Sequence, residues 1–202
     1  MDHFDHAVDD TLSKIDLKNE IGTRNVLVIA PGQSINKFKD NILKFIQEKN
    51  VFIIHLNTVI KEFPYDKVFC SSQKRMDACK IDKTDEKRWI VTSNLYLPEH
   101  FSGKVMDYRT LLKFGWINID NAGILALRLL KSIGIKTIYV AGFDGYNYEK
   151  ATNFYSISMQ KETENYVIDR MNKDIKEMMD DVINNSNGEQ CDVKFITPSK
   201  YV

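Results

Sequence analysis

Residues 26–36 read VLVIAPGQSIN. A run of branched apolar residues leads directly into a Pro-Gly corner and a serine, the order expected where a buried strand turns into a helix. Short apolar runs of the same kind recur along the chain and alternate with amphipathic segments. This alternation predicts an α/β fold with a mostly parallel sheet.

The apolar and amphipathic patterns also predict the bounds of the elements. Strands are expected at 26–30, 51–55, 67–70, 89–92, 104–106, 137–141 and 193–196. Helices are expected at 34–48, 120–133 and about 161–185. In this interpretation residues 1–23 are a charged, partly helical leader or interdomain linker, and residues 24–202 form a single domain.

Composition excludes several classes of protein. The 28 Lys and Arg residues balance 28 Asp and Glu residues, so the chain has no global charge to attract nucleic acid. No apolar run approaches the roughly 20 residues of a membrane helix, and the acidic start MDHFDHAVDD lacks the parts of a signal peptide, so a cytoplasmic location is expected. The three cysteines and four histidines are scattered and predict neither a disulfide framework nor a metal site.

Small and polar residues follow the expected strands. Because ligands of open α/β sheets bind at the carboxyl ends of the strands, these residues are expected to converge on one ligand. A nucleotide suits them, since its phosphates need backbone N–H donors and its ribose and base need polar side chains. The candidate binding residues are Gly32, Gln33, Ser34, Asn57, Ser71, Ser72, Asn121, Ala122 and Gly123. Each of them taken alone is equally compatible with a turn or a helix cap.

The Pro-Gly corner poses a specific question about phosphate binding. If it holds a phosphate, its backbone N–H groups are expected to face an open cleft, and Gly32→Val is expected to abolish binding without harming the fold. The motifs G-x-x-x-x-G-K-[ST] and G-x-G-x-x-G are absent from this turn, so neither a P-loop nor a standard NAD-binding domain is supported.

Asp144 and Tyr146 are the candidate catalytic residues. Asp144 lies between two glycines after an expected strand, where it can accept from a sugar hydroxyl, hold a divalent metal together with phosphates, or simply brace its loop. A transferase needs a base near the reacting oxygen, and Asp144, Tyr146 and Tyr148 are the candidates.

Three stretches together, VLVIAPGQSI, IHLN and IDNAGILALRLLKSIGIKTIYVAGFDGY, resemble the sialyltransferases of glycosyltransferase family 42 and the related pterin pyrophosphokinase-like domains. The resemblance implies a Rossmann-like three-layer sandwich that binds a nucleotide. Gly32, Ser34, Asn57, the 121–123 segment and Asp144 stand where those sialyltransferases carry motif residues. Their general base is a later histidine, and this chain has no histidine after His100, so sialyl transfer from CMP-sialic acid is not expected.

A second resemblance covers more of the length. The order of VLVIAPGQSI, FCSSQKR, AGFDGY and FITPSKY is similar to the C-terminal domain of bacterial 4-hydroxy-2-oxovalerate aldolase-like (HMGL-like) proteins, often near surface-polysaccharide genes. It implies an aldolase barrel in the same polypeptide, and a barrel of eight strand-helix units does not fit within 202 residues. The expected function is nucleotide or nucleotide-sugar binding, with a glycosyltransferase-like activity left open. The alternative is a non-catalytic module of such an aldolase.

Overall fold

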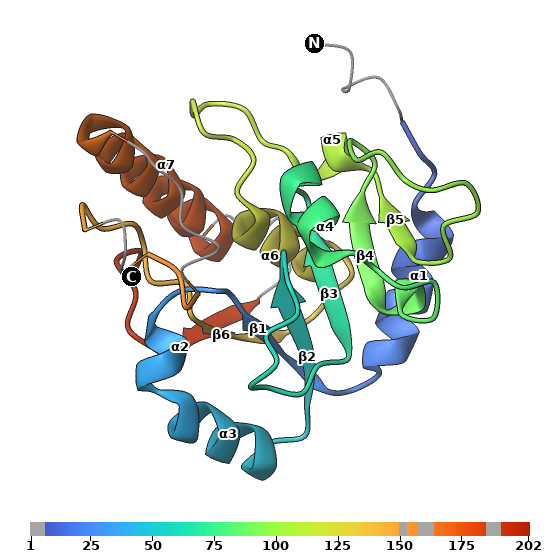
Figure 1. Ribbon diagram of the computed structural model, residues 1–202, viewed down its shortest axis with the longest axis horizontal. Coiled ribbons are helices and arrows are strands. Elements are labelled where there is room, and N and C mark those ends of the chain that lie inside the picture. The colour runs from blue at the N-terminus through green and yellow to red at the C-terminus, as the bar shows by residue number, and fades with distance from the viewer. Residues whose placement is uncertain (1–6, 150–152, 157–163, 185–190) are drawn as a thin grey trace.

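The computed structural model describes residues 7–149, 153–156, 164–184 and 191–202. It is built on a seven-stranded sheet whose neighbouring strands are all parallel, in the order β5-β4-β3-β2-β1-β6-β7 (Figure 1). The strands are β1 (Asn25–Ile29), β2 (Val51–Leu56), β3 (Lys67–Cys70), β4 (Trp89–Thr92), β5 (Lys104–Met106), β6 (Thr137–Ala141) and β7 (Asp192–Phe195). The α/β Rossmann-like sandwich expected from the sequence is confirmed.

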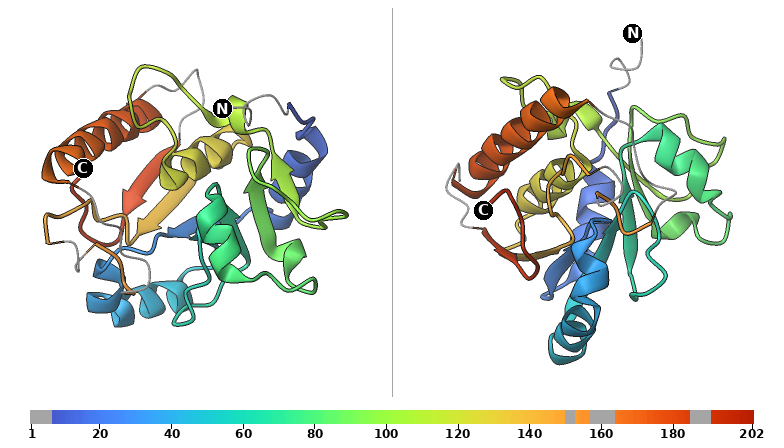
Figure 2. Two further views of the ribbon diagram at one scale, coloured as in Figure 1. Left: turned by 45° about the horizontal axis from the view of Figure 1, so that its top comes forward. Right: turned by 60° about the vertical axis from the view of Figure 1, so that its left-hand side comes forward.

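Helices cover both faces of this sheet (Figure 2). They are α1 (Thr11–Ile21), α2 (Ser34–Lys37), α3 (Lys39–Glu48), α4 (Gln73–Cys79), α5 (Tyr108–Leu111), α6 (Ala122–Ser132) and α7 (Asn165–Asn184). Successive residues of a strand point to opposite faces, so Val26 and Val28 share a core cluster with α1, α6 and α7. Leu27 and Ile29 face the cluster that contains Ile35 of α2 and Ile42 of α3. The core is therefore divided by the sheet into two layers.

The helix expected at 34–48 is interrupted. It divides into α2 and α3 at Phe38, whose φ and ψ of −107° and 20° leave the helical region. Phe38 packs against the core cluster on that face of the sheet. The seven-residue α4 follows β3, and Met76 is its only buried residue. One buried side chain gives no apolar periodicity, so the sequence pattern does not indicate this helix.

The segment expected as a leader or linker contains α1, and that helix packs into the sheet. Leu17 and Ile21 are buried in the largest core cluster. Glu20 forms ion pairs with Lys67 at 2.7 Å and Lys104 at 2.9 Å, which tie α1 to β3 and β5. The sequence pattern is weak here because other apolar side chains of the helix, such as Leu12 at 75% exposure, face solvent.

The strand order has a single switch point. The chain runs outward from β1 to β5 and then returns to place β6 on the other side of β1. The loop after β1 leads to α2 on one face, while β6 is reached from α6 on the other face. In open parallel sheets the crevice at such a point, outside the carboxyl ends of the strands, is where ligands bind.

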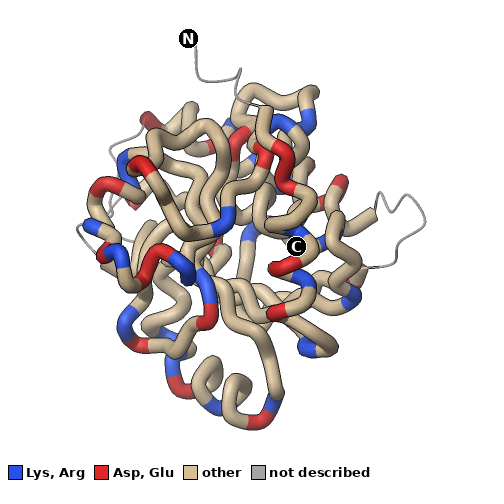
Figure 3. The backbone as a smooth tube through the Cα atoms, turned by 90° about the vertical axis from the view of Figure 1, so that its right-hand side faces the viewer, with Lys and Arg blue, Asp and Glu red and all other residues tan. Residues whose placement is uncertain are grey.

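Charged residues are spread over the molecule. On the side shown in Figure 3, Lys and Arg are interspersed with Asp and Glu.

The longest helix, α7, buries Ile168, Ile175, Met178 and Met179 along one face. Within the described ranges, no helix combines the length and apolar character that crossing a membrane requires.

One histidine is enclosed in the core. His55 on β2 has no exposed surface, and its Nδ1 accepts a hydrogen bond from the Ile60 N–H at 3.1 Å. Burial penalises the imidazolium form and lowers the pKa of His55 from about 6.5 to about 4. The folded protein therefore keeps this side chain neutral.

The neutral His55 makes stability depend on pH. The unfolded chain takes up a proton near pH 6.5 and the folded chain only near pH 4, so stability is complete above pH 6.5 and falls as the pH drops through this window. The shift corresponds to a loss of roughly 3 kcal/mol, at 1.36 kcal/mol per pKa unit. Urea unfolding from pH 7.5 to 4 measures it. His55→Gln should reduce the dependence of the unfolding free energy on pH, whereas His100→Gln, at an exposed position, should leave this dependence as in the wild type. The same pH dependence in all three proteins would contradict the account.

Candidate functional site

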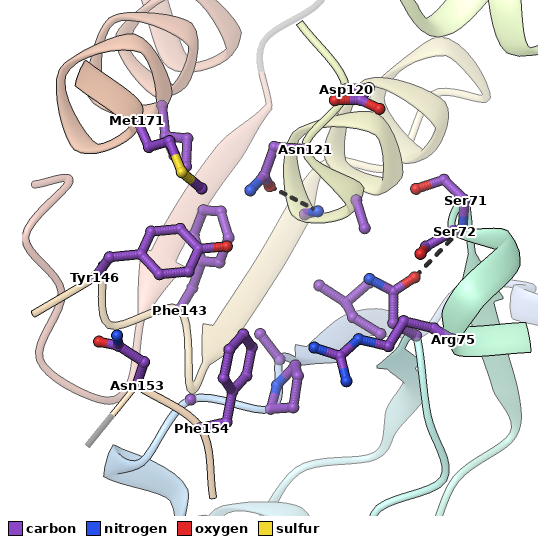
Figure 4. A pocket seen from close by; sticks show the side chains of 18 of the residues that line it. Ser71, Ser72, Arg75, Asp120, Asn121, Phe143, Tyr146, Asn153, Phe154 and Met171 are labelled. Carbon is purple, nitrogen blue, oxygen red and sulfur yellow. Dashed lines mark hydrogen bonds between the residues drawn. The ribbon is translucent and has the colours of Figure 1, made fainter. Parts of the chain in front are cut away.

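A cavity of 610 Å³ lies at the carboxyl ends of the strands. Its walls come from the loops after β1, β2, β3, β4 and β6, from the starts of α4 and α6, and from one face of α7 (Figure 4). The residues expected from the sequence that line it are Gly32, Asn57, Ser71, Ser72, Asn121, Ala122, Gly123, Asp144 and Tyr146. Gln33 and Ser34 lie outside this lining. The structure thus brings most of the expected residues to one place.

The Pro-Gly corner uses its N–H groups within the protein. The Gly32 N–H donates to the Gly142 carbonyl at 2.9 Å, and the Ser34 N–H donates to Asp144 Oδ2 at 2.6 Å. The Ser34 hydroxyl donates to Asp144 Oδ1, and the Gln33 backbone also donates to this carboxylate. The expectation that these groups face an open cleft is wrong, because the Asp144 carboxylate takes the place that a phosphate would need.

The same two loops are in close steric contact. A Cβ added to Gly32 would lie 2.2 Å from the Gly142 carbonyl oxygen, and one added to Gly142 would lie 2.0 Å from the Ala30 carbonyl oxygen. Both clashes involve backbone atoms, which cannot rotate away. Gly32→Val is therefore expected to disturb the fold at the switch point, contrary to the expectation from sequence.

The environment of Asp144 is that of a brace between loops. Burial raises the pKa of its carboxyl above the usual value, against the lowering effect of the hydrogen bonds from Ser34 and Gln33. Its backbone carbonyl accepts from the Lys200 N–H at 3.0 Å. The sequence left open whether Asp144 binds ligand or braces its own loop; the hydrogen bonds show a brace that reaches to the loop after β1.

Amide side chains form the polar wall. Asn57, with a positive φ of 60°, accepts from the Ser71 N–H through Oδ1 at 3.4 Å and so joins the loops after β2 and β3. Asn121 caps α6, because its Oδ1 accepts from the N–H groups of Gly123 at 2.9 Å and Ile124 at 3.2 Å. These bonds orient the amides, and Figure 4 shows the Asn121 nitrogen directed toward the side of the cavity where Tyr146 lies.

The opposite wall is aromatic and apolar. Val167, Met171 and Ile175 recur every four residues on α7, so they share one face and line the cavity together. Tyr146 continues this wall, and its backbone is held by Asn172, which accepts from the Tyr146 N–H at 2.9 Å and donates to its carbonyl at 2.8 Å. Burial raises the pKa of the Tyr146 hydroxyl above 10. The hydroxyl is therefore protonated at neutral pH.

Other cavity residues were missed by the sequence analysis. Their positions are Lys74, Arg75, Asn118, Asn153 and Phe154. Gln73, Asn94 and Asp120 also line the cavity, and the sequence places them after expected strands or at the start of the helix expected at 120–133. Arg75 lies on α4 with its guanidinium carbon 5.2 Å from the centre of the Phe154 ring. The Asn94 Oδ1 is buried without a hydrogen-bond partner in the described part of the protein. Arg75 closely follows the strand expected at 67–70, and this position could have marked it as a candidate. The direction of its side chain depends on the path of α4, which the sequence pattern does not show.

The fold and cavity define a Rossmann-like α/β protein with a cavity at its switch point. Within the described residues, no three His, Cys, Asp or Glu side chains gather into a metal centre. Comparisons with protein-family models, curated proteins and solved structures find no match for the chain. The similarity to sialyltransferases and aldolase C-terminal domains therefore rests on the quoted residues alone.

Replacing Asp144 tests its bracing role. Asp144→Asn places an amide N–H group against the N–H and O–H donors of the Pro-Gly corner. The variant should lower the free energy of unfolding by roughly 1–3 kcal/mol, the usual cost of buried donors left unpaired. The matched control is Asp180→Asn on the exposed side of α7, expected to change stability by less than about 0.5 kcal/mol. Chemical denaturation measures both. Equal stability of the Asp144 variant and the wild type would contradict the bracing role of Asp144.

Proposed function

We propose that this protein binds a nucleotide or a nucleotide sugar in the 610 Å³ cavity. The observation that carries the proposal is a cavity at the switch point of a parallel sheet, with amides on one wall and aromatic and apolar side chains on the other. Sites for small ligands are concave, mostly apolar and furnished with a few placed polar groups, and commonly measure about 300–1,000 Å³.

The two walls suit the parts of a nucleotide. The amides of Asn57, Asn94 and Asn121 offer donors and acceptors of the kind that ribose hydroxyls and base edges require. The buried Asn94 Oδ1 is an acceptor that a ligand N–H or O–H would satisfy. Rings such as Phe143 and Tyr146 provide flat apolar surface for a base.

The geometry favours binding over catalysis. A general base works best with a pKa near the operating pH. The Asp144 carboxylate is occupied by the donors of residues 33 and 34, and the Tyr146 hydroxyl has a raised pKa. A glycosyltransferase-like reaction in surface-polysaccharide metabolism would need another base, and Asp120 is a second carboxylate on the cavity wall.

The second candidate function is a non-catalytic C-terminal module of a 4-hydroxy-2-oxovalerate aldolase-type protein. The hydrogen bonds that occupy the Asp144 carboxylate and the raised pKa of the Tyr146 hydroxyl also favour this candidate. A non-catalytic module needs no general base. In that case the aldolase activity belongs to a separate barrel. Both candidates place the domain in the cytoplasm. Nucleotide binding without turnover of any nucleotide sugar favours the module, and sugar transfer favours the transferase.

Ligand screening by thermal unfolding tests nucleotide binding. CMP, UDP, GDP and their sugars are added to the protein, and a ligand at 100 times its Kd should add about 2.7 kcal/mol, or roughly 5–10 °C in Tm for a chain of this size. Ala122→Phe places a ring in the cavity and should abolish the shift. Ala78→Phe, at an exposed position of α4, is the control and should retain it. A panel without any shift, or a shift that survives Ala122→Phe, would overturn the proposal.

A further inference from the structure

The Pro-Gly corner is not the phosphate site, so a ligand's anionic group needs other partners. The N–H groups of Gly32 and Ser34 are bonded to Gly142 and Asp144. The basic side chains on the described cavity wall are Lys74 and Arg75, both from α4. Lys74 is exposed, whereas Arg75 is half-buried. The positive charge held inside the cavity is therefore that of Arg75.

The position of Arg75 is suited to an anion. Figure 4 shows its guanidinium extending from α4 toward Phe154, below the loop that carries Ser71 and Ser72. The 5.2 Å contact with Phe154 is a cation–π contact, which helps to hold the guanidinium in the cavity. A guanidinium can keep an aromatic ring against its face while its N–H groups bind two phosphate oxygens.

The charge of Arg75 also acts across the cavity. Burial raises the pKa of Tyr146; the Arg75 charge opposes that rise and the Asp120 charge adds to it. Two carboxylates share the cavity wall, but the Asp144 carboxylate is turned to the donors of residues 33 and 34, and Asp120 bonds to the Tyr108 side chain. An anion beside Arg75 thus meets a cation, while the Asp144 carboxylate accepts from the donors of the Pro-Gly corner.

The α7 side of the cavity has the opposite character. The α7 residues in the lining, Val167, Met171 and Ile175, are all apolar. Moving a phosphate against such a wall would cost its hydration without any compensating hydrogen bond. The cavity therefore has a cationic end at α4 and an apolar end at α7.

We propose that Arg75 is the phosphate-binding residue of this cavity and that the base of the ligand lies against the apolar face of α7. The identity of the ligand as a nucleotide rests on the proposed function, whereas the anion site at Arg75 rests on its own geometry. The orientation assigns the two ends of the ligand to two elements that are far apart in the chain.

The experiment compares the binding of an anion that carries no nucleobase with the binding of nucleosides that carry no phosphate. Titration calorimetry follows the binding of inorganic pyrophosphate, and of cytidine, uridine and guanosine, to the wild type and four variants. Arg75→Gln should weaken pyrophosphate binding at least tenfold and leave nucleoside binding unchanged. Arg75→Lys, which keeps the charge without the fork of donors, should fall between. Met171→Gln should weaken nucleoside binding and leave pyrophosphate binding within twofold.

The control variant is Arg170→Gln, which removes the same charge from an exposed position of α7 outside the cavity lining and should bind both probes as the wild type does. Circular dichroism and Tm establish that each variant is folded. Absence of pyrophosphate binding in the wild type, or equal binding by Arg75→Gln, overturns the anion site. Nucleoside binding that Met171→Gln does not weaken overturns the assignment of the base.

These outcomes separate the two proposals. If pyrophosphate binding depends on Arg75 while no nucleoside or nucleotide binds, the anion site stands and the proposed nucleotide function fails. If the nucleosides bind while pyrophosphate binds equally well to Arg75→Gln and to the wild type, the function stands and the phosphate assignment fails.

Discussion

The bond between the Asp144 carboxylate and the Pro-Gly corner is the constraint on which the site depends. It joins residues that are 110 positions apart in the chain, at the point where the strand order reverses. The N–H groups of Ala30 and Gly32, which donate to the carbonyls of Ala141 and Gly142, continue the pairing of β1 and β6 beyond the strands themselves. The loops that would separate to admit a phosphate are instead closed against each other, with contacts too short to accept a side chain at Gly32 or Gly142.

This closure withdraws the N–H donors of the corner from a ligand, although Pro31 and Gly32 still line the cavity. The cavity is bounded by the loops after β1, β2, β3, β4 and β6, the starts of α4 and α6, and the apolar face of α7. The Gly142 carbonyl and the Asp144 carboxylate already accept from the donors at residues 32–34. In the proposed orientation, Arg75 is therefore the group that binds the phosphate of a ligand. The same closure engages the carboxylate of Asp144, one of the candidate bases. Binding is thus the role that the arrangement supports best.

The cavity is assembled from both ends of the chain around the sheet. The polar wall belongs to loops that follow strands, where backbone turns and caps hold the amides of Asn57 and Asn121. The apolar wall belongs to α7, whose Asn172 also holds the backbone of Tyr146 through two hydrogen bonds. One helix therefore shapes the apolar end of the cavity and positions the loop after β6.

The sequence by itself determined the strands, the main helices and the edge of the sheet where polar residues gather. These follow from properties of neighbouring residues: short apolar runs such as 26–29 and 51–54, rich in branched side chains, are typical of strands buried in a parallel sheet, and carboxyl ends of parallel strands share one edge. Tertiary structure alone decided what the donors of the corner bind, that Leu17 and Ile21 of α1 enter the core, and that Arg75 and Met171 face one cavity. The physical reason is that periodicity is a local property, whereas the pairing of a donor with an acceptor 110 residues away depends on where the folded loops meet.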